Sequence, residues 1–291
     1  MPTLGQFLSQ AFNGLAFGSL LALISSGLTI ILGTLGVLNF AHGAMFMLGA
    51  YTAYIVLSHF GSYALALLGG ALALFVVGII TERVLIRRYY DRPPQDQILV
   101  TFGLGIMMVE AMRYGFGGLS QRVPLPSWGH GIVNFGYFFY PMYRVEVIAI
   151  VAVILIIFYL LLYRTSMGLI VRAGIEDPMM VGLLGIHLRR VFMIVFSLGA
   201  VAAGIAGVIY APLASVIPDM GEPFLVQSFV VVVIGGLGSF PGAVVGGIVV
   251  GEMLSLTTIF NPAYAQAAIY AAMTLVLIIR PRGLFGAHGR M

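Results

Sequence analysis

The sequence contains no cysteine, and only 8% of its residues are charged. Without cysteine the chain has no disulfide, no thiolate metal site and no thiol chemistry. Lysine is also absent, because all 14 basic residues are arginines. A Walker A phosphate loop and a Schiff-base enzyme both need lysine, so both are excluded. If ATP drives this protein, a separate chain must bind it.

The charged residues are too few to cover a water-exposed surface, since a soluble domain usually carries about 25%. The 291 residues are 60% hydrophobic, with a mean hydropathy of +1.07. Apolar runs of roughly 18 to 25 residues, long enough to cross about 30 Å of hydrocarbon, recur along the whole length. We therefore expect one polytopic membrane domain over residues 1–291, with membrane lipid around it and no cleaved signal peptide.

The apolar runs predict an all-α helical bundle of about eight or nine spans, some of them broken or re-entrant. The run FVVVVIGG would suggest a strand in water, but an open strand in lipid leaves its backbone unsatisfied, so we interpret it as a helix. The candidate spans cover residues 9–33, 37–58, 63–86, 97–114, 146–163, 191–212, 224–236, 243–259 and 264–280.

Most arginines are concentrated in three segments, and cytoplasmic loops of membrane proteins carry an excess of such residues. We therefore expect all three segments, and the C-terminus, on the cytoplasmic side. This arrangement places residues 115–145 and the N-terminus outside. The segments contain Arg83, Arg87, Arg88 and Arg92, then Arg164, Arg172, Arg189 and Arg190, and finally Arg280, Arg282 and Arg290.

Two glycine-rich interruptions divide the apolar runs, GTLGVLNFAHG at 33–43 and GGLGSFPGAVVGG at 235–247. Irregular backbone at membrane depth is tolerated only where it is buried in protein or lines a cavity. Paired interruptions are the best sequence pointer to the path of a transporter. The second interruption contributes four candidate path residues, Gly235, Gly236, Gly238 and Ser239.

The first interruption contains the polar residues Asn39 and His42. On a helix they share one face with Phe46 and Gly49, which would aim them inward as path residues. The alternative is a helix N-terminus at the interface, for which Asn39 is a good cap. Both interpretations remain open at this point.

Charged residues inside predicted spans are expensive and often functional. Glu252 is the most central of them and is a further candidate path residue, whereas Glu110 and Arg113 are spaced to pair near the end of their span. The five histidines are isolated, with no HExxH or Gly-x-Ser-x-Gly motif. We expect no catalytic residue, no metal site and no cofactor. The net charge of +4 needs no nucleic-acid partner.

Residues 164–190 form a basic loop that carries an apolar stretch. Asp177 can cap a short helix, Pro178 fits its first position, and Gly185 can end it. Apolar side chains such as Met179 and Leu183 follow, although a solvated connector would be polar throughout. Such patches mark interaction surfaces. The loop is expected either to fold back on the membrane face or to dock a partner protein.

Three ordered segments resemble a known family: GLTIILGTLGVLNFAHGAMFMLGAYTAY, RAGIEDPMMVGLLGIHLRRVFMIVFSLGAVAAGIAGVIYAP and GGLGSFPGAVVGGIVVG. Over nearly its whole length the chain resembles permease subunits of ABC importers for branched-chain amino acids, and it is most similar to the first of the two paired permeases. Urea, amide and ribose-type permeases are broader relatives. The resemblance implies the all-helical ABC importer permease fold and a multi-pass location in a bacterial inner membrane.

The resemblance also implies the function and the partners. A non-enzymatic permease of this type forms the path for amino acids delivered by an extracytoplasmic substrate-binding protein. It works with a second permease subunit, as a heterodimer, and with two ATP-binding subunits that hydrolyse ATP. Substrate selectivity is expected to reside largely in the binding protein.

The loop at 164–190 looks like the coupling helix that docks on the ATPase in such importers. In that class a glycine follows the glutamate of a Glu-Ala-Ala motif by six residues. Glu176 and Gly182 keep this spacing, but Asp177 and Pro178 replace the two alanines, and the following Ile-x-Leu-Pro is missing. The implied coupling residues are Arg172, Glu176, Asp177, Gly182, Gly185 and Arg189.

Two other function classes are weighed against this one. An ion-coupled secondary transporter would use Glu252 as its ion-linked carboxylate, but such carriers usually show more polar residues within their spans. An intramembrane enzyme is disfavoured because no catalytic pair is visible in the sequence. Dependence of transport on ATP, rather than on an ion gradient, separates the importer from the secondary transporter.

Overall fold

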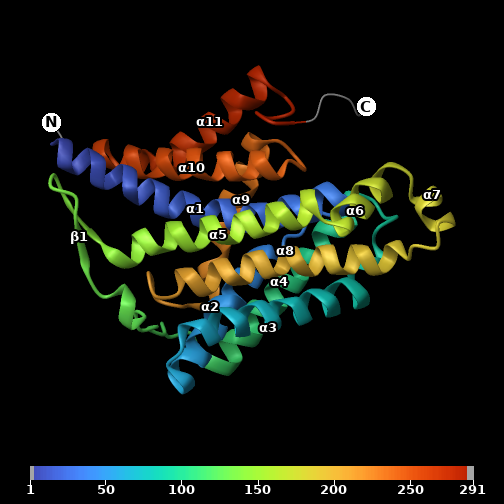
Figure 1. The fold of residues 1–291 in the computed structure, drawn as a ribbon, viewed down its shortest axis with the longest axis horizontal. Coiled ribbons are helices and arrows are strands. Elements are labelled where there is room, and N and C mark those ends of the chain that lie inside the picture. Colours follow the sequence, from blue (N-terminus) through green and yellow to red (C-terminus); the bar gives the residue numbers. More distant parts are fainter. Residues whose placement is uncertain (1–2, 287–291) are drawn as a thin grey trace.

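The computed structural model describes residues 3–286 and shows an elongated helical bundle (Figure 1). Eight helices in the described part are long and apolar enough to cross a membrane, which confirms the predicted all-α membrane fold. The long helices are α1 (Leu4–Leu35), α2 (His42–Phe60), α3 (Tyr63–Val84), α4 (Pro94–Phe116), α5 (Met142–Arg164), α8 (Leu188–Tyr210), α10 (Phe240–Phe260) and α11 (Ala265–Ile279). Helix α11 reaches the length of a span only together with the turn before it, as the 18 residues Pro262–Ile279. Shorter elements are α6 (Ser166–Glu176), α7 (Pro178–Leu183), α9 (Gly221–Gly235), the strands β1 (Ile132–Asn134) and β2 (Phe139–Pro141), and the 3₁₀ turns η1 (Ile86–Arg88), η2 (Ser127–Gly129), η3 (Pro218–Met220) and η4 (Pro262–Tyr264).

Helix α1 forms the centre of the bundle. Its most apolar 18-residue window is 83% buried, whereas the corresponding window of α4 is only 6% buried. The outer helices expose large apolar side chains, for example Leu72 on α3, Leu99 on α4 and Ile156 on α5. A surface this apolar is unfavourable in water and is stable against lipid tails. The exposure pattern is therefore that of a membrane-embedded bundle.

Small residues allow α1 and α10 to approach closely. A Cβ added at Gly18 would lie 2.9 Å from the Gly247 carbonyl oxygen, and one added at Gly251 would lie 2.5 Å from the Gly14 carbonyl oxygen. Helix association in lipid depends on such close backbone packing, because apolar burial from water is absent there. These glycines therefore fix α10 against the central helix.

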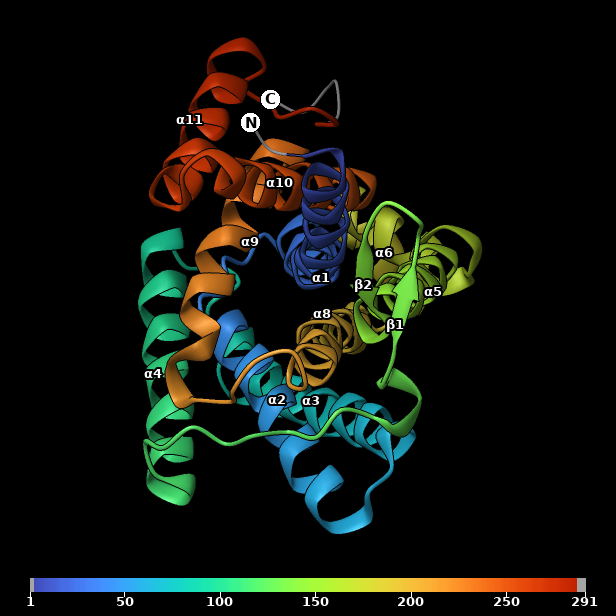
Figure 2. The ribbon, with the colours of Figure 1, turned by 90° about the vertical axis from the view of Figure 1, so that its left-hand side faces the viewer.

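Helix α9 does not run along the bundle. Figure 2 looks down the bundle and shows α1 and α8 end-on, whereas α4 and α9 are seen from the side. The 15 residues of α9 extend about 22 Å at 1.5 Å per residue, which is short of the roughly 30 Å hydrocarbon core. The run predicted as a span at 224–236 is thus a short helix that crosses the bundle.

The segment between α4 and α5 carries a β-hairpin that the sequence analysis does not predict. In the hairpin Val133 of β1 pairs with Tyr140 of β2. Gln121, earlier in the same segment, pairs with Val216 in the connection between α8 and α9. Trp128 packs against the ring of Tyr63, with ring centroids 5.3 Å apart. These contacts hold the whole segment against one end of the bundle.

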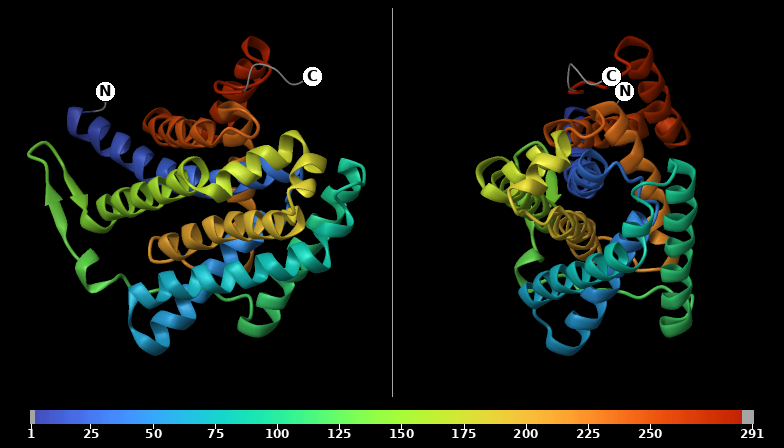
Figure 3. Two further views of the ribbon diagram at one scale, coloured as in Figure 1. Left: turned by 45° about the vertical axis from the view of Figure 1, so that its right-hand side comes forward. Right: turned by 90° about the vertical axis from the view of Figure 1, so that its right-hand side faces the viewer.

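The three arginine-rich segments lie together at the opposite end. Figures 1 and 3 show η1, the α6–α7 region and the last described residues at the end of the bundle away from the hairpin. Two helices, α3 and α4, meet at the first segment, α5 and α8 flank the second, and α11 leads to the third. Arg290 lies outside the described residues. The chain passes from the second segment to the third through α8, α9, α10 and α11, so the predicted even number of passes requires that the short α9 be counted as one of them.

Candidate functional site

The first interruption is a stretch of non-helical backbone inside the bundle, between α1 and α2. Residues 36–41 lie outside both helices. The Thr101 hydroxyl of α4 accepts a hydrogen bond from the Phe40 nitrogen at 3.1 Å and lies 3.1 Å from the Leu38 carbonyl oxygen. Buried backbone that leaves a helix needs such side-chain partners, because no lipid group can replace them. Thr101 therefore fixes the interruption from a neighbouring helix.

Asn39 and His42 both lie in this region, but not on one helix face. The predicted shared face is wrong for Asn39, because α2 begins only at His42. Instead, the Asn39 Oδ1 atom accepts from the Ala41 nitrogen at 3.1 Å and closes a turn ahead of the helix. His42 is fully buried, and its Nε2 atom lies 2.9 Å from the Ile24 carbonyl oxygen of α1. The path role of both residues stays a prediction.

The second interruption is the tight connection between α9 and α10. Gly236 and Gly238 have φ values of 106° and 78°, a region that glycine enters without steric strain. The Ser239 side chain caps α10 by accepting from the Gly242 nitrogen at 3.1 Å. A Cβ added at Gly235 would clash with the backbone of Gly242. These four candidate residues thus shape the turn, and their path role also stays a prediction.

The structure brings the two interruptions together. A Cβ added at Gly33, at the end of α1, would lie 2.7 Å from the Cα atom of Gly238. At the other end of α9, a Cβ added at Gly43 would lie 2.5 Å from the Gly221 carbonyl oxygen. The start of α9 and the connection that follows it therefore pack on the two ends of the first interruption. Sequence reasoning pointed to both segments but contained no signal for this contact.

Four aromatic rings from four helices meet beside α9, and we refer to Phe17, Phe46, Tyr210 and Phe224 as the aromatic plug. Phe224 lies in the middle of the group. Its ring centroid is 4.3 Å from that of Phe46, 4.7 Å from that of Tyr210 and 5.6 Å from that of Phe17. Rings at these distances form a close-packed cluster. The plug blocks the space between α1, α2, α8 and α9.

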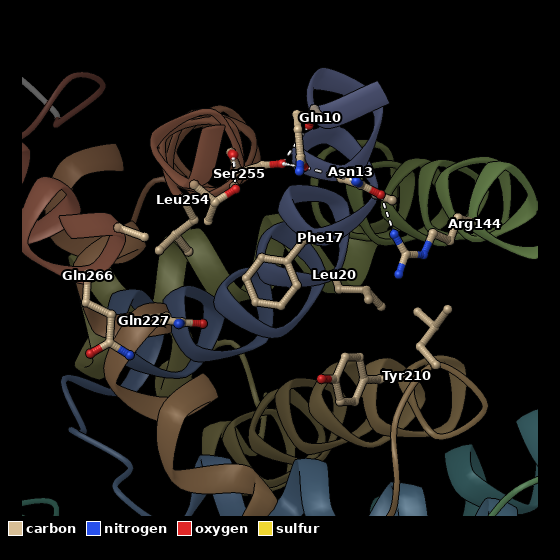
Figure 4. Close-up of a pocket in the computed structure, with 15 residues that line it drawn as sticks. Gln10, Asn13, Phe17, Leu20, Arg144, Tyr210, Gln227, Leu254, Ser255 and Gln266 are labelled. Atoms are coloured by element: carbon tan, nitrogen blue, oxygen red, sulfur yellow. Dashed lines mark hydrogen bonds between the residues drawn. The ribbon is translucent and has the colours of Figure 1, made fainter. Parts of the chain in front are cut away.

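A cavity of about 420 Å³ lies against the plug, between α1, α5, α9, α10 and α11 (Figure 4). Phe17 and Tyr210 belong to both its lining and the plug. Figure 4 shows polar side chains on opposite walls, with Asn13 and Arg144 on one and Gln227 on the other. We call this space the outer cavity, because it lies toward the hairpin end of the bundle. Sequence reasoning missed it, because its residues come from distant parts of the chain.

Glu252 lies next to the outer cavity without lining it. It is on α10 and faces α1, where a Cβ added at Gly14 would lie 2.7 Å from its Oε2 atom. The side chain is partly buried and forms no ion pair within residues 3–286. Its predicted role in the path is neither supported nor contradicted by this placement.

The opposite end of the bundle carries the helix predicted in the loop at 164–190. The carboxylate of Asp177 caps α7 by accepting from the nitrogens of Met179 and Met180 at 3.1 and 2.9 Å. Pro178 is its first residue, and Gly185 follows its end with a φ of 78°. The predicted cap, first residue and terminating glycine are confirmed.

Helix α7 presents an apolar surface away from the protein. Val181 faces inward and is 5% exposed. The helix does not pack this surface on the rest of the described chain, so contact with the membrane face and docking of a partner both remain predictions for it. We call the exposed apolar residues of and beside α7 the α7 surface: Met179 (77% exposed), Met180 (60%), Leu183 (73%) and Leu184 (76%).

The other predicted coupling residues lie around the α7 surface. Arg172 of α6 donates to the Leu162 carbonyl oxygen at 2.6 Å, and its guanidinium lies 5.7 Å from the ring centroid of Tyr163. Glu176 ends α6, Gly182 lies in α7 in open space, and the exposed Arg189 is in the first turn of α8. Helix α6 itself, which links α7 rigidly to α5, was not predicted.

Two further ionic clusters fix the ends of the bundle. Arg113 pairs with Glu110 at 3.4 Å, as predicted, but also with Asp219 at 2.7 Å, which the sequence did not indicate. At the other end, Glu82 accepts from Arg87 at 2.7 Å and from Tyr90 at 2.9 Å. Burial, and then the adjacent Glu82 carboxylate, raise the pKa of Tyr90. Each cluster joins a loop to a helix.

Comparison with known proteins places these features in one family. The family described as "Branched-chain amino acid transport system / permease component" matches residues 10–278. The chain is 30% identical to the high-affinity branched-chain amino acid transport system permease protein BraD of Pseudomonas aeruginosa, over 98% of each protein. It is 31% identical to LivH of Salmonella typhimurium, over 96% of each.

A second type of permease also matches, at a lower level. The chain is 27% identical to LivM of Escherichia coli, over 90% of this chain and 67% of that protein. LivM is likewise named as a high-affinity branched-chain amino acid transport system permease protein. No solved structure matches the chain.

Proposed function

Because the chain belongs to the family of branched-chain amino acid transport permeases, we propose that it is the transmembrane permease subunit of an ATP-driven ABC importer for branched-chain or related amino acids. It is a multi-pass membrane protein, with eight helices of sufficient length and apolarity to span the bilayer. The observation that carries the proposal is the match over residues 10–278, supported by 30% identity to BraD over nearly both chains.

ATP is bound and hydrolysed by separate subunits, because a chain without lysine has no phosphate loop. The α7 surface supports docking of such a subunit, since exposed apolar patches of this kind mark protein interfaces. Movement of α7 would reach α5 through α6, where Arg172 holds the Leu162 carbonyl oxygen and the Tyr163 ring. The coupling role is assigned to Arg172, Glu176, Asp177, Gly182, Gly185 and Arg189.

The arginine-rich end of the bundle faces the cytoplasm in this proposal, as the distribution of arginines in membrane proteins requires. The C-terminus is then cytoplasmic, and the N-terminus and the hairpin are external. An extracytoplasmic binding protein would deliver the amino acid at the hairpin end. The similarity to both LivH and LivM supports a complex of two unlike permeases, of which this chain is one.

The path is proposed to pass the region where the two interruptions meet. Interrupted helices in the two halves of a transporter commonly mark its path, and here both ends of α9 pack on the first interruption. The aromatic plug closes this route in the described conformation. The candidate path residues remain Asn39, His42, Gly235, Gly236, Gly238, Ser239 and Glu252.

ATP dependence tests the proposal. The chain, its second permease, the ATP-binding subunits and the binding protein are reconstituted in proteoliposomes, and uptake of radiolabelled leucine is measured. We expect uptake to require ATP and to persist when the ion gradients are collapsed. Uptake that follows an ion gradient and ignores ATP would instead establish the secondary transporter.

The docking role of the α7 surface is tested separately. Leu183→Asp places a charge in the middle of the exposed patch, so the ATP-binding subunits should no longer co-purify with the tagged chain in mild detergent. Leu119→Asp is the matched control, because Leu119 is 80% exposed in the segment at the hairpin end. Equal recovery of the ATP-binding subunits with both variants would assign docking to another surface.

A further inference from the structure

We propose that the outer cavity is a binding site for a free α-amino acid, with the guanidinium of Arg144 holding its α-carboxylate. The inference rests on the proposed function and assigns the residues of this chain that would bind its substrate. The site belongs to this chain and is distinct from any site on a delivering protein.

The position of Arg144 in the cavity wall points to an anionic group on the ligand. It lies in the first turn of α5, half-buried in the cavity wall. None of the ion pairs formed within residues 3–286 includes it. A guanidinium offers five donors in a planar fork that matches a carboxylate, and a charge at membrane level is costly without a partner. A carboxylate in the cavity would provide that partner.

The guanidinium is held in place from one side. Its Nη1 atom donates to the Oδ1 atom of Asn13, which also accepts from the Tyr140 hydroxyl at 3.1 Å. Asn13 in turn donates to Gln10 at 3.0 Å, and Gln10 accepts from Ser255 at 2.9 Å. This chain of hydrogen bonds is shown in part in Figure 4. Besides Asn13 and the neighbouring Tyr140, no described side chain within residues 3–286 is recorded as a hydrogen-bond partner of the guanidinium. Such prior orientation of a binding group reduces the entropy lost on binding.

The remaining lining fits the other parts of an aliphatic amino acid. The Oε1 atom of Gln227, on the wall opposite Arg144, is buried and has no hydrogen-bond partner in the described structure. It offers an acceptor to an ammonium group. Phe17, Leu20 and Leu254 provide an apolar surface for the side chain. No aspartate or glutamate is among the lining residues, so Arg144 gives the cavity a single charge.

The size and position of the cavity agree with a receiving site. Its volume of about 420 Å³ falls within the roughly 300–1,000 Å³ of small-molecule sites. On the inner side it ends at the aromatic plug, through the shared rings of Phe17 and Tyr210. A ligand that enters from the hairpin end would therefore stop at the plug until the helices around it move.

Equilibrium binding to the assembled complex tests this assignment directly. The complete permease–ATPase complex is placed in lipid nanodiscs without binding protein, and bound tritiated leucine is displaced by leucine or by leucinamide, which lacks the carboxylate. Leucinamide is expected to compete at least about 30-fold more weakly, because it has no carboxylate to pair with the half-buried guanidinium of Arg144. Arg144→Gln should weaken leucine binding by a similar factor and remove the difference between the two competitors.

Matched variants separate the site from general effects of charge and folding. Arg122→Gln makes the same charge change at an exposed position of the external segment and should bind leucine like the wild type. Gln227→Met changes the opposite wall and should weaken leucine binding several-fold. Leucinamide should still compete more weakly than leucine in this variant. This variant tests the cavity even if Arg144→Gln fails to assemble.

The outcomes also distinguish this inference from the proposed function. If the wild-type complex takes up leucine with ATP but binds leucine and leucinamide equally, or if assembled Arg144→Gln binds leucine normally, the site is overturned and the importer stands. If the wild-type complex with its binding protein shows no ATP-dependent uptake, the proposed function itself is overturned.

Discussion

Several polar side chains act on backbone groups that the two interruptions leave free. Thr101 bonds the stretch at 36–41, Asn39 closes its turn, and Ser239 caps the helix that follows the second interruption. An unpaired backbone group in a water-free interior costs several times what a typical hydrogen bond contributes. These residues therefore make irregular backbone possible at membrane depth.

Replacement of Thr101 tests this conclusion. Thr101→Val keeps the shape but removes the oxygen that accepts from Phe40 at 3.1 Å, so the Phe40 nitrogen loses its partner. We expect the free energy of unfolding to fall by about 1–3 kcal/mol, measured as a lower midpoint of unfolding of the detergent-purified complex. Thr101→Ser, which keeps the hydroxyl, should remain near wild type. A valine variant as stable as the serine variant would contradict the role of Thr101.

The sequence indicated some of these residue roles and missed others for identifiable reasons. The cap of α7 was predictable because Asp, Pro and Gly act locally on the backbone around them. Arg144 was missed because the predicted span began at 146, whereas α5 begins at Met142. An error of four residues moved this arginine from a helix that lines a cavity to an external loop. Its contact with Asn13 depends on packing, which local sequence does not encode.

Among the secondary-structure elements, α9 and the first interruption form one packed unit. Glycine at both contacts lets backbones touch, at Gly33 with Gly238 and at Gly43 with Gly221. The first interruption and the one that follows α9 were predictable, since glycine and proline break apolar runs, whereas α9 itself was predicted as a span. Their contact was not, because nothing local relates segments so far apart in the chain. The crossing orientation of α9 follows from that contact rather than from its apolar composition.

A methyl group added at Gly43 should push α2 and α9 apart. In Gly43→Ala the new Cβ would lie 2.5 Å from the Gly221 carbonyl oxygen, so α2 or α9 must shift. Overpacking of this kind costs about 1–3 kcal/mol and should lower the unfolding midpoint and the rate of leucine uptake together. Gly103→Ala is the control, because no atom lies within 4 Å of its added Cβ and helical alanine is favoured over glycine. Equal unfolding midpoints and uptake rates for the two variants would show that the close contact does not contribute to stability or transport.

For the molecule as a whole, the two ends of the bundle have different chemistry. The hairpin end carries aromatic residues, the outer cavity and Arg144, whereas the opposite end carries the arginine-rich segments and the exposed α7 surface. Under the proposed function, a delivered solute and a docked ATPase would therefore meet the chain at opposite ends. The aromatic plug and α9 lie between the two ends, and α5 joins them directly, from Arg144 at the outer cavity to α6 beside α7.

The absence of cysteine makes the orientation directly measurable, since a single introduced thiol is the only one in the chain. Tyr137→Cys, at a hairpin residue that is 75% exposed, and Met179→Cys, at an α7 residue that is 77% exposed, mark the two ends. In intact cells a membrane-impermeant maleimide is expected to label only the first, because arginine-rich loops stay in the cytoplasm. Met179→Cys should react after permeabilisation, which controls for its accessibility. Labelling of Met179→Cys in intact cells would invert the orientation, and it would place the α7 surface where no ATPase can reach it.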